Sequence, residues 1–600
     1  MASEVRLPEA SVNDLYAAWA RRRERLLEMD RAGVAAAEAE IERLRRVLGI
    51  REVPDLSWAL LREAAETAEL DREAALARAA LAVRLSPDLP GPRFALARLR
   101  LAQAPGEVGA WAGEVWAGLK QVFSVDPVRR TAAGNLVLIL LTGLLAAGVV
   151  FVLVTMGRVL RTFLHDLHHL LPRGSTRLQA GVLGVALLVA PFVLGLGLAF
   201  GVVVLAAAAW LYVGLRDRVV LALTLGIFAA TPVVLDQVAA VAGFWNAPAG
   251  DLWLLENTAR QEGPARRLEA WAKAHEGQVP WQIFHALGNW HLRSGRLDEA
   301  EAMFQRALSV EGRAAPSLVG LGIVRFARGD LPGAKESFKA AIAADPKHAP
   351  AYHNLAKVYF RMGELEPGQE ARRRARELDR ALVTAHPDEA SELNVGLAGC
   401  PLPTPFPPAL VVPEDAKDAS ALVDVRLSSI GPPDAAPLVP AGGLALLLLV
   451  GFVFGRLRPS KTCVKCGRSV CHRCDPDVGH GHLCGQCVNV FQKRGAVPPQ
   501  VKVEKELRIR RYQALKDRIA AALSLVLPGA GQVASGRPVA GFLLLTVFLA
   551  AAAAFAAYFG PISDPLTVGA RLPLARAVIG GGAGLVAYIL AQWGIFRRNP

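Results

Sequence analysis

The sequence predicts a mainly α-helical protein with a multipass membrane region, a solenoid of helical repeats and a small zinc-binding module. Three observations support this fold class. Hydrophobic residues make up 52% of the 600 residues, and several uncharged runs are long enough to cross a bilayer, which takes about 20 residues. Between these runs, small and aromatic residues recur with a fixed period. Six of the seven cysteines fall between Cys463 and Cys487.

Residues 1–130 are polar and rich in alanine, arginine, glutamate and leucine. In the stretch 18–50, leucine, isoleucine, methionine and valine recur with helical spacing among charged residues, which predicts an N-terminal helical domain. The first residues lack a basic region followed by an apolar stretch, so no cleavable signal peptide is expected.

The region 131–245 is expected to form a membrane domain of about four spans. Residues 131–157 form one uncharged run, and a second, Val219–Leu235, continues towards Phe244 as another span. Between them, 178–215 holds 38 residues without a charge, which is too long for one ordinary span and predicts a hairpin that turns near Gly195–Gly201. Further segments bring the expected total to seven or eight: the transmembrane helix 435–457, and the runs 519–536, 538–563 and 577–596 within the C-terminal membrane segments 519–600.

Residues 251–395 contain an internal period of 34 residues. It relates Gly295, Gly329 and Gly363, and also three pairs: Ala300 and Ala334, Phe304 and Phe338, Ala307 and Ala341. Small residues at such positions allow two helices to cross closely, while large ones fill the space between successive hairpins. Over residues 281–380 the pattern resembles the tetratricopeptide repeat (TPR) family, and Pro346 stands where that family ends a repeat.

The resemblance implies stacked helical hairpins with a concave groove that binds a protein or peptide partner, and it implies no catalysis. Gly312 replaces the family's proline in the first repeat, and Gly368 replaces an alanine in the third, so the outer repeats are expected to be degraded or capping. Residues 251–280 are expected to add one hairpin, and the proline-rich residues 396–434 to form an extended linker. A weaker echo of the spacing lies in the N-terminal domain, where it fits an alanine-rich helix equally well: Ala75, Ala82 and Pro87.

The module 460–495 carries its cysteines in the pattern C-x2-C-x4-C-x2-C-x9-C-x2-C. The first and third pairs have the spacing of a four-cysteine zinc site, in which each C-x2-C turn offers two thiolates to one ion: Cys463, Cys466, Cys484 and Cys487. The remaining candidate ligands, for a second ion, are Cys471, Cys474, His480 and His482. In the alternative cross-brace, the first cysteine pair joins the two histidines and the second pair joins the third. The segment resembles treble-clef and cross-braced zinc modules.

We expect one or two structural zinc ions in this module. Disulfides, iron bound by four thiolates and dithiol redox chemistry are the alternatives that the cysteine spacing leaves open. Thiolate ligands need a reducing compartment, and basic residues flank the module on both sides, including the basic helix 500–518. The module is therefore expected on the cytoplasmic side of a bacterial inner membrane, with the repeats on the periplasmic side. The side of the N-terminal domain stays open, because Arg129 and Arg130 conflict with an external position.

Four smaller features are candidates for a functional role. His165, His168 and His169 have helical spacing that suits a metal, although an amphipathic helix at the membrane interface explains it more simply. Residues 528–541 resemble the PG-x-GQ-x3-G-[RK] signature of small bacterial two-helix membrane hairpins, and a tight structural turn is the expected role. Asp236 lies in an apolar span, where an acid is a candidate functional residue. Cys400 stands by itself in the linker and is expected to have no role.

Together these features favour a membrane-anchored scaffold or adaptor that is not an enzyme. Its expected partners are a protein or peptide in the repeat groove and the lipid bilayer. The net charge of +14 is assigned to cytoplasmic arginines, because no basic patch interleaved with aromatic residues indicates nucleic-acid binding. Two other classes are open: a transporter or channel-like protein with Asp236 near its path, and a metal or redox sensor that uses the cysteines.

Overall fold

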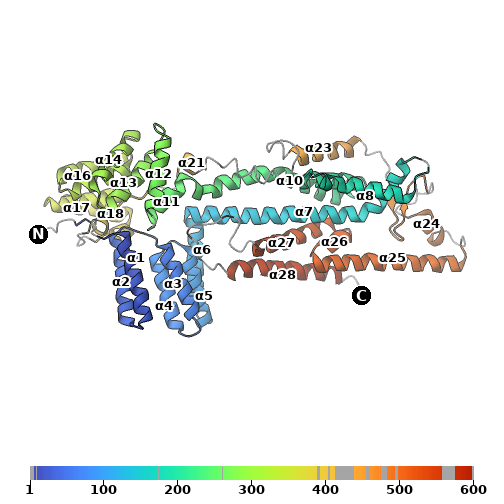
Figure 1. Cartoon of the computed structure of the whole chain (residues 1–600), viewed down its shortest axis with the longest axis horizontal. Coiled ribbons are helices and arrows are strands. Elements are labelled where there is room, and N and C mark those ends of the chain that lie inside the picture. The colour runs from blue at the N-terminus through green and yellow to red at the C-terminus, as the bar shows by residue number, and fades with distance from the viewer. Residues whose placement is uncertain are drawn as a thin grey trace. The chain divides into compact units, whose positions relative to one another are not determined.

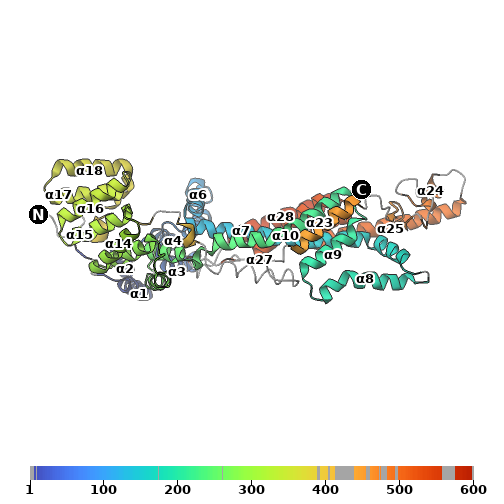
Figure 2. The ribbon, with the colours of Figure 1, turned by 90° about the horizontal axis from the view of Figure 1, so that it is seen from above.

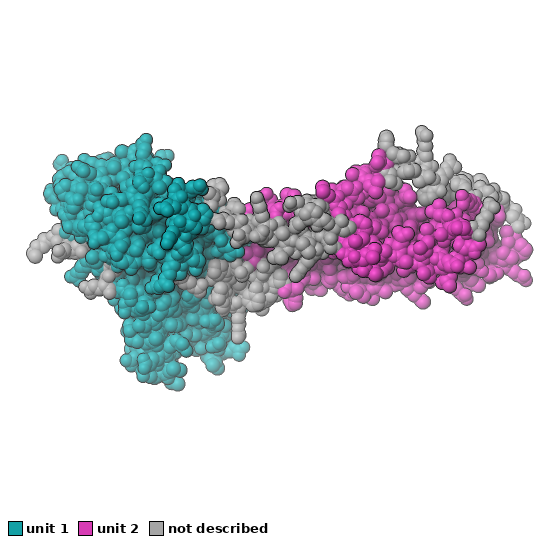
Figure 3. All heavy atoms as spheres, turned by 45° about the horizontal axis from the view of Figure 1, so that its top comes forward, with its two compact units in different colours: residues 1–132, 242–413, 564–571 teal, residues 133–241, 414–563, 572–600 magenta. Residues whose placement is uncertain are grey.

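The computed structural model describes residues 6–596 except 8–9, 173, 260, 388–391, 403–405, 412–437, 454–459, 472, 475–482, 493–496, 557–561, 563–565 and 567–573. Helices account for nearly all of the regular structure (Figures 1 and 2). The chain divides into two compact units, coloured separately in Figure 3: residues 1–132, 242–413 and 564–571, and residues 133–241, 414–563 and 572–600. We describe each unit by itself.

The first unit begins with three helical hairpins, each made of two consecutive helices: α1 (Val12–Leu27) with α2 (Arg31–Val47), α3 (Pro54–Thr67) with α4 (Arg72–Leu85), and α5 (Pro90–Gln103) with α6 (Val108–Ser124). The carboxylates of Asp30 and Asp71 start α2 and α4 by accepting backbone N–H groups of the first turn. The weak repeat echo falls on α4, where Ala75 and Ala82 are fully buried. Small buried residues on the second helix of a hairpin let it approach its neighbours closely.

A buried ion-pair network, which the sequence did not indicate, ties the first two of these hairpins together. The Arg22 side chain on α1 is 0% exposed, and its guanidinium donates to Glu38 at 2.8 Å and to Glu63 at 3.0 Å. It also lies over the Trp19 ring, 4.7 Å from the centroid. Two carboxylates and an aromatic face therefore compensate the charge of an arginine that is withdrawn from water.

The repeat domain follows in the same unit, with η1 (Gly243–Asn246) and four hairpins: α11 (Pro248–Asn257) with α12 (Glu262–Ala274), α13 (Trp281–Arg293) with α14 (Leu297–Val310), α15 (Ala315–Ala327) with α16 (Leu331–Ala344), and α17 (Ala349–Arg361) with α18 (Leu365–Leu378). The hairpin α11–α12 is the extra one expected before the repeats. Consecutive helices also pack from one hairpin to the next, α14 on α15 and α16 on α17. The domain is therefore a stack of helix pairs, as predicted.

The 34-residue period has a direct packing cause. The fully buried Phe304 ring lies between α13 and α15, where a Cβ on Gly288 or Gly320 would come within 2.7 or 2.5 Å of it. One repeat later, Phe338 lies 2.5 Å from the Cβ position of Gly322. The glycines that end the first helix of each pair have positive φ, a conformation that side chains disfavour: Gly295, Gly329 and Gly363.

Three short helices follow the repeats: α19 (Arg380–Ala385), α20 (Leu393–Gly396) and α21 (Pro408–Val411). Residues 393–402 lie against the repeat domain, with Leu393, Leu397 and Cys400 inside its core. The predicted boundary at 395/396 thus falls inside an ordered segment, and the expectation of a linker from residue 396 is wrong for 396–402. Most of the proline-rich stretch, 412–434, lies outside the described residues.

The second unit is built from apolar helices: α7 (Asp126–Leu170), which starts in the first unit, α8 (Arg177–Val193), α9 (Leu198–Trp210), α10 (Leu215–Ala242), α23 (Leu438–Val453), α27 (Pro538–Ala556) and α28 (Leu574–Phe596). Among the described residues, three helical stretches have the length and composition to cross a membrane: Asp126–Leu170, Leu215–Asn257 and Pro538–Ala556. The total of seven or eight spans stays a prediction.

The run 178–215 forms two helices, α8 and α9, as expected. They are joined at Leu194–Gly197, where Gly195 and Gly197 both have positive φ. With 17 and 13 residues, however, each helix is shorter than the roughly 20 residues of an ordinary span.

Small residues let the long helices of this unit come together. On α7, a Cβ at Gly143 would meet the Ala550 backbone of α27 at 2.7 Å, and one at Gly148 would meet Thr224 of α10 at 2.6 Å. Apolar helices associate through such close packing, because a lipid environment supplies no hydrophobic drive between them. An ion pair adds to these contacts, since Arg158 of α7 donates to Asp217 of α10 at 2.8 Å.

The predicted separation between a basic helix 500–518 and a span 519–536 is wrong. One continuous helix, α25 (Pro499–Val526), covers the basic stretch and the first part of the apolar one. It ends before Pro528, where Gly529 has φ +101° and a side chain there would collide with the Gly541 carbonyl. The short helix α26 (Ala530–Ala534) then leads into α27. The tight turn expected at this glycine-rich motif is therefore present, but it closes a helix that carries charges.

Candidate metal centre and the inner face of the repeats

A short β-hairpin presents the first cysteine pair of the module. Strands β1 (Lys461–Thr462) and β2 (Ser469–Val470) are antiparallel and form the one sheet among the described residues. Between them the Cys463 N–H donates to the Arg468 carbonyl and the Gly467 N–H to the Cys463 carbonyl, both at 2.9 Å. Gly467 has φ +71°, which lets the chain turn back tightly. The two thiols of Cys463 and Cys466 therefore project from one turn.

The second pair comes from a helix start. Cys484 is the N-cap of α24 (Gly485–Phe491), and Cys487 lies in its first turn. Cys463, Cys484 and Cys487 are at most 1% exposed. The module rests on α25, whose Ile509 joins its core and whose Tyr512 ring lies directly against Gly467. The four cysteines thus come from a β-hairpin turn and a helix start.

The spacing of these four sulfurs fits a tetrahedral ion. The Sγ atoms of Cys463 and Cys487 are 3.8 Å apart, and those of Cys466 and Cys484 are 3.7 Å apart. Sulfurs bound at about 2.3 Å to one zinc ion lie about 3.8 Å from one another in a tetrahedron. A disulfide needs about 2.05 Å, and all seven cysteines are free thiols. The four-cysteine arrangement is therefore the one the fold builds.

Local hydrogen bonds favour a thiolate at Cys463, whereas burial raises the pKa of the Cys484 and Cys487 thiols. Burial raises the pKa of the Cys463 thiol, but backbone N–H groups of Cys466, Cys484 and Lys465 directed at its sulfur outweigh burial and lower the pKa to about 7. Such N–H···S contacts are what a metal-bound thiolate accepts. The donor set, its geometry and its burial all fit zinc, which these four residues would hold in a closed site without an open coordination position.

The other predicted ligands are arranged differently from either expected scheme. Among the described residues, Cys484 and Cys487 group with Cys463 and Cys466, as in the four-cysteine scheme, and Cys471 and Cys474 are not part of that group. They lie instead beside two histidines of α7, and the ligand atoms of the four residues are all within 4.8 Å of one another: His165, His169, Cys471 and Cys474. His480 and His482 lie outside the described residues. The interpretation of the α7 histidines as part of an interfacial helix did not anticipate this grouping.

A second candidate site is the face formed by the first helices of the repeats. Here Asn354 of α17 makes two hydrogen bonds with the backbone of Ala398: its Nδ2 donates to the Ala398 carbonyl at 3.0 Å, and its Oδ1 accepts the Ala398 N–H at 2.9 Å. Both groups are buried, and Asn354 is 0% exposed. One asparagine thereby satisfies both backbone groups of one residue, independently of that residue's side chain.

A second group of hydrogen bonds joins side chains of α13 to residues further along the same segment. The Cys400 carbonyl contacts His285 Nε2 at 2.9 Å and accepts from Asn289 Nδ2 at 3.0 Å. The Glu256 carboxylate accepts from Asn289 at 2.9 Å and from the Leu402 N–H at 3.0 Å. Cys400, expected to have no role, is thus a buried anchor, and burial together with the nearby Glu256 raises the pKa of its thiol.

The face that was expected to receive a partner therefore holds part of the same chain. We call residues 393–402 the resident segment. Its backbone is bound by polar side chains of the repeat helices, while Leu393 and Leu397 enter the core of the repeats. Sequence reasoning missed this, although Asn289 and Asn354 stand within otherwise apolar helix faces and were available as a signal.

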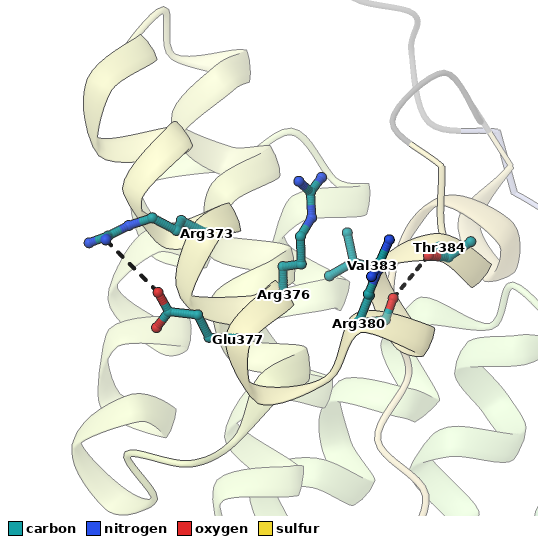
Figure 4. Close-up of a pocket in the computed structure, with 6 residues that line it drawn as sticks. All are labelled: Arg373, Arg376, Glu377, Arg380, Val383 and Thr384. Atoms are coloured by element: carbon teal, nitrogen blue, oxygen red, sulfur yellow. Dashed lines mark hydrogen bonds and ion pairs between the residues drawn. The ribbon is translucent and has the colours of Figure 1, made fainter.

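An open depression lies on α18 and α19, at the end of the repeats (Figure 4). It is lined by Arg373, Arg376, Glu377, Arg380, Val383 and Thr384. Arg373 and Glu377 are within 3.9 Å of each other, and Thr384 donates to the Arg380 carbonyl. A lining that is mostly charged and exposed differs from the apolar, enclosed pockets that bind small molecules.

The remaining candidates carry structural contacts. Gln532 of the glycine-rich turn is 3% exposed and donates to the Ala591 carbonyl of α28 at 2.7 Å. Gln592 in turn donates to the Ser524 carbonyl of α25 at 2.9 Å. The motif thus joins three helices, as a structural turn should. Asp236 is exposed on α10.

Comparison with known families agrees with the repeat assignment. A family model described as the TPR repeat matches residues 322–363, which run from the middle of α15 to the glycine after α17. A comparison with curated proteins finds no match. The match supports a role for this domain in protein–protein interaction, and the stacked helix pairs agree with it.

Proposed function

We propose that this protein is a membrane-anchored scaffold whose repeats bind an extended peptide of a partner protein. The observation that carries the proposal is the grip of Asn354 on the resident segment. Because this contact reads a peptide backbone rather than a particular side chain, a partner segment in the same conformation would form it equally well. The resident segment then acts as the chain's own competitor for the face.

The resident segment competes with a partner peptide because it is covalently part of the same chain. A tethered ligand acts at an effective concentration of about millimolar, so a partner peptide must bind more tightly or arrive when the segment has loosened. A small residue, Ala398, occupies the position that Asn354 binds, and Leu397 precedes it. We therefore expect a partner segment with a small residue at the position of Ala398 and a leucine-like residue one position before it.

Anchoring and sidedness complete the proposal. Three apolar helical stretches of sufficient length support insertion into a bilayer. The four-cysteine site supports a structural zinc ion and, with it, a reducing compartment for the module. On the topology argued from the sequence, the module faces the cytoplasm of a bacterial cell and the repeats face the periplasm. The protein itself carries out no catalysis.

Peptide binding tests the proposal directly. The full chain in detergent is titrated with a fluorescent synthetic peptide of residues 392–402, and anisotropy is measured. We expect weak binding to the native chain, clear binding to Leu397→Asp, which expels the resident segment, and none to Leu397→Asp combined with Asn354→Ala. The matched control adds Glu336→Ala, an exposed position on α16, to Leu397→Asp and should leave binding intact.

The partner is sought with a photo-crosslinking residue placed in cells at Lys357, next to the face on α17, or at Glu336 on the opposite side of the repeats. The proposal requires one discrete protein crosslinked from position 357, more of it in Leu397→Asp and less in Asn354→Ala. A crosslinking pattern that is identical from the two positions, or that Asn354→Ala leaves unchanged, would contradict it.

A further inference from the structure

We infer that His165, His169, Cys471 and Cys474 form a second metal site, which fastens the cysteine module to the end of α7. The site is separate from the four-cysteine centre, and it does not depend on the proposed peptide binding. It takes a divalent ion of the zinc class, since two imidazoles and two thiolates are a donor set that suits zinc.

The geometry of the four residues carries the inference. His165 and His169 are one helical turn apart on α7, with ring centroids separated by 4.7 Å. The Cys474 sulfur lies 3.1 Å from Nε2 of His169 and 3.8 Å from Nε2 of His165. In a tetrahedral site with Zn–S of about 2.3 Å and Zn–N of about 2.05 Å, a nitrogen and a sulfur lie about 3.6 Å apart. The two measured distances bracket this value.

A hydrogen bond between one histidine and one cysteine would not bring four ligand atoms together. Here one ring nitrogen from each of two histidines and the Sγ atoms of two cysteines all fall within 4.8 Å of one another. The third histidine of the cluster differs, because His168 Nε2 contacts the Ser175 carbonyl at 3.2 Å. The structure thus identifies His165 and His169 as ligands and excludes His168. The spacing of the three histidines in the sequence could not make this distinction.

Contacts on both sides of the site hold the same two elements in register. Arg473 of the module donates to the His169 carbonyl at 3.1 Å. One turn towards the start of α7, Asp166 accepts the Ser460 N–H at 3.1 Å and also the Ser460 hydroxyl, and the Thr162 and Thr462 hydroxyls are 2.8 Å apart. These side chains lie on the face of α7 that carries His165 and His169. Such surrounding contacts are what orients the ligands of a metal site.

The two sites differ in burial, and this predicts a difference in behaviour. Three of the four ligands in the four-cysteine site are buried and Cys466 is partly exposed, whereas in the second site Cys474 is exposed and the other three ligands are partly exposed. A chelator therefore reaches the second ion first. Its loss would release the module from α7 while leaving the module itself folded around its own ion.

Metal analysis of the full chain in detergent tests the inference. We expect two zinc ions per native chain and one in the double variant His165→Ala with His169→Ala. His168→Ala, the matched control, should keep two. One ion in the native chain, two in the double variant, or a disulfide between Cys471 and Cys474 in protein purified without oxidant would overturn the inference.

Cobalt substitution gives a second readout. With Co2+ in both sites, the visible spectrum should be the sum of a four-sulfur and a two-sulfur, two-nitrogen centre, and the latter contribution should disappear in the double variant. Unlike the double variant, the single variant His165→Cys should bind the second equivalent of Co2+, and its spectrum should shift towards that of a three-sulfur centre. Retention of the four-sulfur bands in the double variant shows that the module is still folded, so a loss of the second ion cannot be attributed to unfolding.

Discussion

Replacing Asn354 by alanine should open the repeat face without unfolding the repeats. The asparagine makes two buried hydrogen bonds with Ala398, at 3.0 and 2.9 Å. Each is worth about 1 kcal/mol net, and a buried peptide group left without its partner costs about 1–3 kcal/mol. We therefore expect the free energy that holds the resident segment in place to fall by about 2–3 kcal/mol.

Cys400 reports this opening from within the segment. Its side chain is 3% exposed, and its sulfur lies 3.3 Å from His348 Nε2. A thiol reagent reaches it only when the segment leaves the face, so its labelling rate follows the population of the open state. A change of about 2–3 kcal/mol corresponds to roughly 30- to 150-fold faster labelling, because 1.36 kcal/mol is a factor of ten. The rate is measured by mass spectrometry of the peptide that contains Cys400, in the full chain.

The control for this experiment is Gln305→Ala, at an exposed position on α14. Its Cys400 should be labelled at the native rate, and the thermal midpoint of both variants should stay within a few degrees of the native value. An unchanged labelling rate in Asn354→Ala would refute the reasoning, since it would mean that the hydrogen bonds with Ala398 do not hold the segment.

Three further outcomes are expected in the first unit. Burial, with the nearby Asp88 charge, raises the pKa of Glu52 to about 8, so folding favours its protonated form. Its contribution to stability is complete below pH 4.5 and is lost as pH rises towards 8. Glu52→Gln should therefore match the native chain at pH 4.5 and exceed it increasingly up to pH 8, by up to about 5 kcal/mol; an equal difference at all pH values would contradict this. Arg22→Ala leaves two carboxylates without their buried partner and should cost about 3–5 kcal/mol in chemical denaturation, whereas a cost below 1 kcal/mol would show that the network adds nothing. Gly322→Leu places a side chain against the Phe338 ring and should disrupt the repeats, seen as a lower thermal midpoint and loss of peptide binding; a native midpoint would show that the helix crossing is looser than the structure indicates.

The sequence predicted those features whose cause is local or periodic. The TPR-like pairing followed from the 34-residue spacing of glycine and phenylalanine. Each buried phenylalanine ring, such as that of Phe304, packs on a glycine of the first helix, Gly288 in this case, at a fixed distance along the chain. The four-cysteine site followed from two C-x2-C turns, since each turn presents its own pair of thiols. Hydropathy placed the long apolar helices, because a span depends on the composition of one continuous stretch.

What the sequence did not reveal depends on residues distant in the chain. His169 and Cys474 are 305 positions apart, so neither the histidine spacing on α7 nor the leftover cysteine pair indicated the other. Cys400 looked unimportant because the partners of its carbonyl lie on α13, more than 100 residues earlier. The span expected at 519–536 failed for another reason. Hydropathy marks where charges stop, while α25 continues through that point until Pro528 and Gly529 end it.

The length of α25 gives the apolar helices of the second unit a mechanical connection to the cysteine module. Near the middle of α25, Ile509 and Tyr512 support the module; near its C-terminal end, the Ser524 carbonyl is held by Gln592 of α28. Ser524 follows Ile509 by 15 positions, or about 22 Å of unbroken helix. A lever of this length turns a tilt of about 10° at α28 into a displacement of about 4 Å at the zinc ligands. If the apolar helices insert into a bilayer as proposed, a change in bilayer thickness would reach the module as movement along this unbroken helix.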